Sequence, residues 1–475
     1  MKNPITIRAI QMLTKEEMKL FQLFLSSPFH NRNALLNRMV DWLKPYVDTK
    51  SATTFSKKAL FEFLYPQQGY NEARIRNLMS ELLHQVQAFL VQINLKSQSI
   101  LAEKSLLNEL MQREGFTLVS KSLEKLEGAL QQKNWPDESY FYDVYQLSHF
   151  EDLNLLNQEK RGHSKHLQAK SEALDHYFLL EKLRVACEMQ SRNVVVQSNY
   201  ICHFMDELLL FFEHLPKASK HQRALEIYVT AYKMLKDDPN QAHFYHLKNL
   251  LQNLSTSIPI TVLKDLYTYM LNIGVREVNT GNTKFYAEVL NLYKILLEKG
   301  ILLSGGNLTQ WAFTNIVMAG IRLKDYDWTE AFILTYAAYL PSEVRDNAVA
   351  FNRANLAFEK KEYHQAQKQL LTVEFHDAYY QLAAKVLLLK IYFLNRESEP
   401  LCSLVETSKR LIERNRQLSD YQKKSNHNFF RFALRLYTRL TVVNRSPSKI
   451  VMLKAQIEQC DLLANKQWLL EQMPK

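Results

Sequence analysis

The sequence predicts an all-α protein: an α-solenoid of stacked antiparallel helix hairpins, preceded by a helical N-terminal cap. The chain of 475 residues contains only 10 Gly and 12 Pro, about 2% and 2.5%, whereas ordinary proteins carry roughly 7% and 5%. Sheet-rich folds need these residues at turns, and nucleotide-binding α/β folds need glycine-rich loops. Apolar residues also recur at helical spacing along most of the chain. We therefore expect helices almost throughout.

A second observation is an internal repeat between residues 311 and 373. Three pairs of residues lie 35 positions apart: Ala319 and Ala354, Trp328 and Tyr363, and Ala331 and Ala366. Small residues that recur about every 34 positions are typical of stacked helix hairpins. A single hairpin cannot bury its own apolar face and needs neighbours. We expect Ala354 and Ala366 to lie where the two helices of a hairpin cross, because a small side chain permits close approach.

These offsets resemble the tetratricopeptide family over about residues 311–373. The resemblance implies a superhelix in which the first helix of each hairpin lines a concave, peptide-binding face. Counting back from Ala366 places four residues at or near that face: Phe351, Asn352, Asn355 and Phe358. The first unit has Phe313, Ile316, Gly320 and Leu323 at comparable places, without the Lys and Arg that some family members use to clamp a terminal carboxylate.

The amide groups of Asn can hydrogen-bond the N–H and C=O of an extended peptide, while Phe supplies apolar area. The alternative is that Phe351 and Phe358 simply pack into the next unit, as aromatics at helical spacing usually do. Tyr379–Leu394 is apolar nearly all round, and we interpret it as the first helix of a third unit.

The N-terminal region begins with capping signals. Thr14 and Glu17 have capping-box spacing, which predicts a helix through Leu25. Asn31 or Asn33 then opens a helix through Trp42. The string from 24 to 33, FLSSPFHNRN, resembles the N-terminal signature of uncharacterised bacterial helical-repeat proteins, and this resemblance implies no activity.

A short helix (56–64), a turn (65–70) and a long helix capped by Asn71 follow. Arg74 and Arg76 lie near the start of the long helix. This order has two interpretations: a helix-turn-helix that reads DNA, or a hairpin that caps the exposed end of the solenoid. The connection is longer than the usual turn of a helix-turn-helix, which favours the cap.

The whole chain is predicted to have four parts. They are an N-terminal helical cap (1–98), degenerate helical repeats (99–306), tetratricopeptide-like repeats (307–418) and basic C-terminal capping helices (419–475). The net charge is +11, with +6 in residues 1–100 and +8 in residues 401–475. Arg431, Arg435 and Arg439 form one basic stripe on a C-terminal helix. The stripe either binds phosphates or an acidic peptide, or is a solvated outer face.

Spacings typical of enzymes and metal sites are missing. Glu81 and His84 form a single Glu-x-x-His, whereas a di-iron bundle needs two. Glu159, His163 and His166 share one predicted helix face, as do His243 and His246, but one helix rarely surrounds an ion. We therefore expect a non-enzymatic scaffold without cofactor or metal that binds a protein or peptide, with nucleic-acid binding or regulation through the basic ends as the alternative.

The cysteines and apolar stretches indicate a location. The four cysteines are far apart and form no CxxC pair, which suits a reducing cytoplasm. We see no signal peptide at the start and no stretch of about 20 uncharged apolar residues that would span a membrane. A cytoplasmic protein is therefore the expectation.

Overall fold

The computed structural model describes residues 4–48, 55–113, 116–157, 164–196, 200–214, 220–303, 305–372, 377–415, 418–441 and 447–474. These residues form 23 α-helices and one 3-10 turn and contain no strand, which confirms the all-α prediction. The chain divides into two compact units. Unit 1 comprises Met1–Leu183 and Leu210–Glu226, and unit 2 comprises Arg184–Leu209 and Ile227–Lys475.

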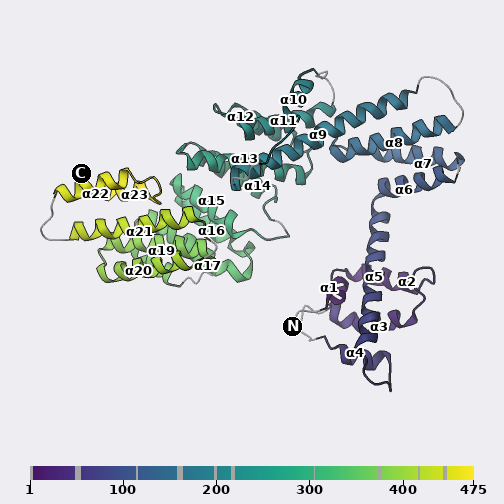
Figure 1. The fold of residues 1–475 in the computed structure, drawn as a ribbon, viewed down its shortest axis with the longest axis horizontal. Coiled ribbons are helices and arrows are strands. Elements are labelled where there is room, and N and C mark those ends of the chain that lie inside the picture. Colours follow the sequence, from purple (N-terminus) through teal and green to yellow (C-terminus); the bar gives the residue numbers. More distant parts are fainter. Residues whose placement is uncertain are drawn as a thin grey trace. The chain divides into compact units, whose positions relative to one another are not determined.

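Unit 1 begins with a five-helix bundle in which the first four helices gather around the fifth (Figure 1). The helices are α1 (Ile5–Gln11), α2 (Lys15–Ser26), α3 (Ala34–Asp48), α4 (Lys57–Leu64) and α5 (Glu72–Ser97). The capping box before α2 is confirmed, because Thr14 Oγ1 accepts from Glu17 N at 3.2 Å and Glu17 Oε2 accepts from Thr14 N at 2.8 Å. Asn33 accepts from Leu35 N at the start of α3, and Asn71 from Arg74 N at the start of α5.

The next helices of unit 1 pack in sequence, α6 on α7 and α7 on α8. Leu107, Val119 and Leu126 are fully buried between them. Three helices contribute residues to both units: α9, α10 and α11. The bounds are α6 (Ser99–Gln112), α7 (Phe116–Gln131), α8 (Glu138–Asn157), α9 (Lys165–Val196), α10 (Met205–His214) and α11 (Lys220–Lys236).

Unit 2 continues with helices that pack on their neighbours in the chain. In addition, α15 packs on α17 and α17 packs on α19, and Figure 1 shows α17 to α21 gathered together. The bounds are α12 (Ala242–Leu254), α13 (Ile260–Asn279), α14 (Phe285–Glu298), α15 (Gln310–Arg322), α16 (Tyr326–Tyr336), η1 (Ala337–Tyr339), α17 (Ser342–Glu359), α18 (Tyr363–Leu371), α19 (Ala378–Asn395), α20 (Ser398–Arg414), α21 (Asp420–Thr441), α22 (Pro447–Glu458) and α23 (Lys466–Glu471).

Three turns in unit 2 have the same backbone geometry, and each connects two consecutive helices. Lys324, Lys361 and Arg396 have φ values of 59°, 65° and 59°, in the left-handed region. In each turn, the N–H of the next residue donates to the carbonyl five residues before it. The turns lie 37 and then 35 positions apart, and the 3-10 turn η1 lies in the longer interval. The left-handed turn therefore recurs, and its first interval is two residues longer than the spacing of 35 that the sequence predicts.

This register decides which residues lie where the helices cross. Ala354 and Ala366 are fully buried, which confirms their packing role. With an interval of 37, the equivalent of Ala366 in the first unit is Thr329, also fully buried, whereas Ala331 is exposed. A Cβ on Gly320 would lie 2.2 Å from Thr329 Oγ1. Glycine is therefore what lets α15 approach α16 at this point.

Candidate functional site

The side chains of α15, α17, α19 and α21 line a cavity of about 360 Å³ in unit 2, which we call the three-helix groove after its first three helices. The groove residues occupy equivalent positions on the three helices when α15 is aligned with α17 by an interval of 37 and α17 with α19 by an interval of 35. One row is Thr314, Phe351 and Val386; the next, one helical turn further on, is Met318, Asn355 and Lys390; the last contains Arg322 and Glu359. Positions four apart lie on one helix face, so three neighbouring helices present the same face to the groove.

Three of the four residues expected at the concave face line this groove: Phe351, Asn355 and Phe358. Asn355 is half-buried, and its Nδ2 donates to Phe351 O at 2.9 Å, which leaves further amide hydrogen-bonding capacity. Phe358 is half-buried beside Tyr363, at 5.6 Å between ring centroids. Phe351 is buried and packs edge-on against the Tyr380 ring at 5.7 Å between centroids, as the packing alternative expects, so Asn355 and Phe358 are the predicted residues with exposed surface in the groove.

Asn352 does not line the groove. It is fully buried, and its Nδ2 donates to Thr314 Oγ1 at 3.1 Å and to Ala348 O at 2.8 Å. Thr314 in turn shares a hydrogen bond of 3.3 Å with the Tyr380 hydroxyl. The structure thus gives Asn352 an internal role: it holds the floor of the groove by tying α17 to α15.

The residues predicted for the first unit need a correction. Phe313 and Ile316 are fully buried, Gly320 lies against α16, and Leu323 is outside the groove. The physical reason is the longer first interval, which rotates α15 so that residues two positions away from the predicted equivalents face the groove.

Sequence analysis missed two cations of the groove, Arg322 and Lys390, and the longer first interval explains only Arg322. Lys390 Nζ donates to Asn465 Oδ1 at 2.7 Å and lies 5.5 Å from the centroid of the Trp468 ring. Burial, and then the charge of Arg322, lower the pKa of Lys390 to about 8, although the charges of Glu359 and Glu471 oppose the shift. If α15 and α17 are aligned with an interval of 37, Arg322 corresponds to Glu359. If α17 and α19 are aligned with an interval of 35, Lys390 corresponds to Asn355.

The basic stripe of α21 is partly engaged within the protein. Arg435 Nη2 donates to Gln456 Oε1 at 2.9 Å, and Arg439 donates to the backbone oxygen of Lys449, so both tie α21 to α22. Arg431 is exposed. Burial, followed by the charges of Arg439 and Arg431, lowers the pKa of Arg435. Of the three arginines, Arg431 is the exposed one, and its guanidinium lies 4.9 Å from the centroid of the Phe432 ring.

The predicted helix-turn-helix region uses its first arginine internally. The guanidinium of Arg74 lies 4.2 Å from the Tyr65 ring centroid and donates to Gln68 Oε1 at 2.9 Å. Both partners belong to the turn between α4 and α5. Arg74 therefore fastens this turn through a cation–π contact and a hydrogen bond.

The metal hypotheses find no support in the described part of the chain, where no group of three ligands comes together. Glu81 Oε2 accepts from Asn33 Nδ2 at 2.8 Å. Glu159 and His163 lie outside the described residues, and His166 Nδ1 is 2.7 Å from Glu151 Oε2.

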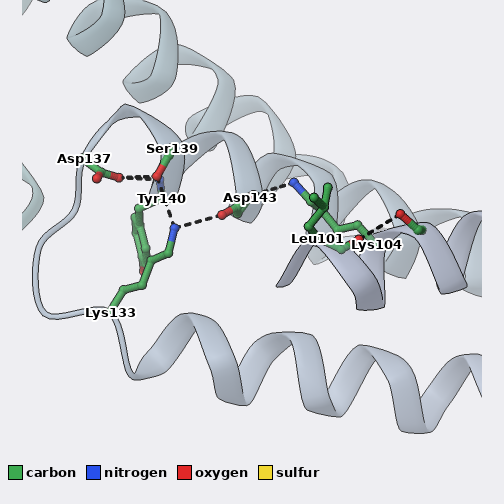
Figure 2. A network of polar contacts seen from close by, with 8 residues as sticks. Leu101, Lys104, Lys133, Asp137, Ser139, Tyr140 and Asp143 are labelled. Atoms are coloured by element: carbon green, nitrogen blue, oxygen red, sulfur yellow. Dashed lines mark hydrogen bonds and ion pairs between the residues drawn. The ribbon is translucent and has the colours of Figure 1, made fainter. Parts of the chain in front are cut away.

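A buried charge cluster lies between α6, α7 and α8 in unit 1 (Figure 2). Asp143 is buried and accepts from Lys104 Nζ at 2.6 Å and from Lys133 Nζ at 3.0 Å. Lys133 also donates to Ser139, whose hydroxyl donates to Asp137 at 2.7 Å. Because both oxygens of Asp143 are taken up by lysines from neighbouring segments, the cluster joins these segments together.

Comparisons with protein families, curated proteins and solved structures find no match to this chain. Among the described residues, no helix is long and apolar enough to cross a membrane.

Proposed function

We propose that this chain is a non-enzymatic, tetratricopeptide-like α-solenoid that binds an extended segment of a partner protein in the three-helix groove. The observation that carries the proposal is the repetition of one helix face on α15, α17 and α19 around a single cavity. Stacked hairpins create such extended binding surfaces without catalytic chemistry. The proposal stands on this geometry.

The chemistry of the groove suits a peptide backbone. Phe358 offers apolar area and Asn355 offers an amide on the same face of α17, over the buried Phe351. Asn426 and Gln422 add two further amides from α21. Amides can satisfy the N–H and C=O groups of an extended chain while aromatic side chains bury its side chains, which is how grooves obtain affinity and specificity together.

The test is a double substitution, Asn355→Ala with Phe358→Ala, in the full chain. Partners captured by affinity purification and identified by mass spectrometry are expected to be lost, while helicity measured by circular dichroism stays unchanged. Gln365→Ala with Gln369→Ala is the matched control, because both residues are on α18 and line a separate depression. Unchanged capture by the groove variant, or equal loss in the control, would contradict the proposal.

A second candidate is nucleic-acid binding by the basic C-terminal region, favoured by the arginine stripe of α21. Its three arginines follow one helix face, where Arg431 is exposed while Arg435 and Arg439 also bond to α22, and guanidinium groups bind phosphates well. Reversal of Arg431, Arg435 and Arg439 to Glu should then abolish a salt-sensitive gel shift with DNA or RNA. Absence of any shift at low salt would remove this candidate.

A further inference from the structure

Two cations from different helices share the wall of the three-helix groove. Arg322 is in the last turn of α15 and Lys390 is in α19, and α17 packs against both helices. Burial, and then the charge of Arg322, lower the pKa of the lysine. Two positive groups therefore line one cavity together with Asn355.

Neither cation has a carboxylate at ion-pair distance in the described part of the chain. Lys390 instead donates to the neutral carboxamide oxygen of Asn465, at 2.7 Å. Glu359 is the third charged residue of the groove lining, so the groove carries a net charge of +1. A partly buried ammonium group with a neutral partner is costly, and a carboxylate would give it a much stronger hydrogen bond.

We propose that the groove selects its partner by an acidic side chain, whose carboxylate binds between Arg322 and Lys390 and replaces Asn465 on the lysine. This inference rests on the proposed function and specifies the ligand of the same groove. Asn465 is exposed, so its side chain can turn into water when the carboxylate arrives. The Asn465 Oδ1 atom thus occupies the position beside Lys390 Nζ where we expect a carboxylate oxygen of the ligand.

The geometry favours a side chain within the segment over the end of a chain. Arg322 belongs to the first helix of the groove and Lys390 to the third, while Phe351, Asn355 and Phe358 of the second helix lie between. A segment that uses the aromatic and amide groups of α17 crosses the groove from helix to helix. It therefore extends past the cations on both sides and offers them a side-chain carboxylate.

The experiment selects ligands from a random pool, so the partner protein does not have to be identified first. The full chain is used to select short random peptides displayed with carrier sequence on both sides. Selected peptides are then synthesised with a free or an amidated C-terminus, and with each Asp or Glu changed to its amide, for fluorescence anisotropy. We expect enrichment of acidic residues and a loss of about tenfold or more in affinity when one acidic residue becomes an amide.

Variants of the protein locate the effect. Lys390→Met and Arg322→Met should each weaken the acidic peptide by about tenfold, since each removes one charged hydrogen-bond donor. Glu359→Gln should strengthen it, because a competing carboxylate is removed. Lys385→Met is the matched control: Lys385 is on the same helix and half-buried, but it does not line the groove. It should leave affinity unchanged.

Each result is decisive. Neutral peptides that bind in the groove, with affinity lost in Phe358→Ala but kept in Lys390→Met, overturn the acidic inference and leave the proposed function standing. Dependence on the free C-terminus alone also overturns it. Failure to select any peptide whose binding depends on Phe358 counts against the proposed function itself.

Discussion

Replacement of Lys390 by Met should stabilise unit 2 near neutral pH while it weakens an acidic ligand. The pKa of Lys390 falls from the ordinary 10.5 to about 8 because the ammonium group is buried and faces Arg322. A difference of about 2.5 between the two pKa values corresponds to about 3 kcal/mol of cost for the charged form near neutral pH. Loss of the Asn465 hydrogen bond offsets about 1 kcal/mol. The net expected gain is about 2 kcal/mol.

The sign of the pH dependence follows from proton binding. Since the folded protein holds the Lys390 proton less tightly than the unfolded chain, this lysine makes stability rise with pH between about 8 and 10.5. The advantage of Lys390→Met should therefore shrink by about 2 kcal/mol between neutral pH and about pH 10. Arg322, Glu359 and Glu471 are present in both proteins, so Lys390 is the titrating group that distinguishes them.

The assay must report on this part of the chain, because two compact units need not unfold together. Fluorine NMR of fluorotryptophan-labelled protein during urea unfolding provides this, since Trp468 lies beside Lys390 and Trp135 belongs to unit 1. Lys368→Met, at an exposed lysine of α18, controls for general removal of charge from unit 2. Destabilisation by Lys390→Met near neutral pH, or a gain independent of pH, would refute the reasoning.

Three further predictions concern packing and charge. Gly320→Ala should lower the free energy of unfolding by about 1–3 kcal/mol, because the new methyl group would lie 2.2 Å from Thr329 Oγ1. Gly128→Ala should raise it by about 0.5–1 kcal/mol, because Gly128 is on a helix and a Cβ there has nothing within 4 Å. Thermal unfolding of the two variants tests this difference. Asp143→Ala should lower the free energy of unfolding of unit 1 by about 2–3 kcal/mol, because two lysines lose their shared carboxylate. Urea unfolding measures this loss, and an unchanged midpoint would show that the cluster does not stabilise the unit. Burial, and then the charge of Lys170, lower the pKa of His149 below 6.5. Because the unfolded chain binds the proton more readily, unit 1 should lose stability as the pH falls through about 6.5. The His149→Gln variant should lose less stability in unfolding experiments at mildly acidic pH.

The sequence predicted the helices and the existence of a repeat, because these depend on local signals. Thr14, Asn33 and Asn71 begin helices through their own side chains, and scarcity of Gly and Pro excludes other fold classes. Phe351, Asn355 and Phe358 were found because they share one helix with the well-matched Ala354.

The other groove residues could not be predicted, because their positions depend on how α15 aligns with α17, and local sequence signals do not define that alignment. Trp328 and Ala331 align with Tyr363 and Ala366 by residue type, yet the turn at Lys324 places Thr329 at the crossing. Two residues correspond to about half a turn of helix. That rotation is enough to bury the predicted side chains and to bring Arg322 into the groove in their place.

The recurring left-handed turn gives the chain a natural unit of growth. Lys324, Lys361 and Arg396 each join the two helices of a hairpin with the same backbone conformation, so a helix pair copied in frame from Asp325 to Lys361 would begin and end on matching geometry. Such a duplication would add one more helix face to the row and lengthen the surface offered to a ligand. Gene duplication can therefore change the reach of this protein in whole hairpin steps.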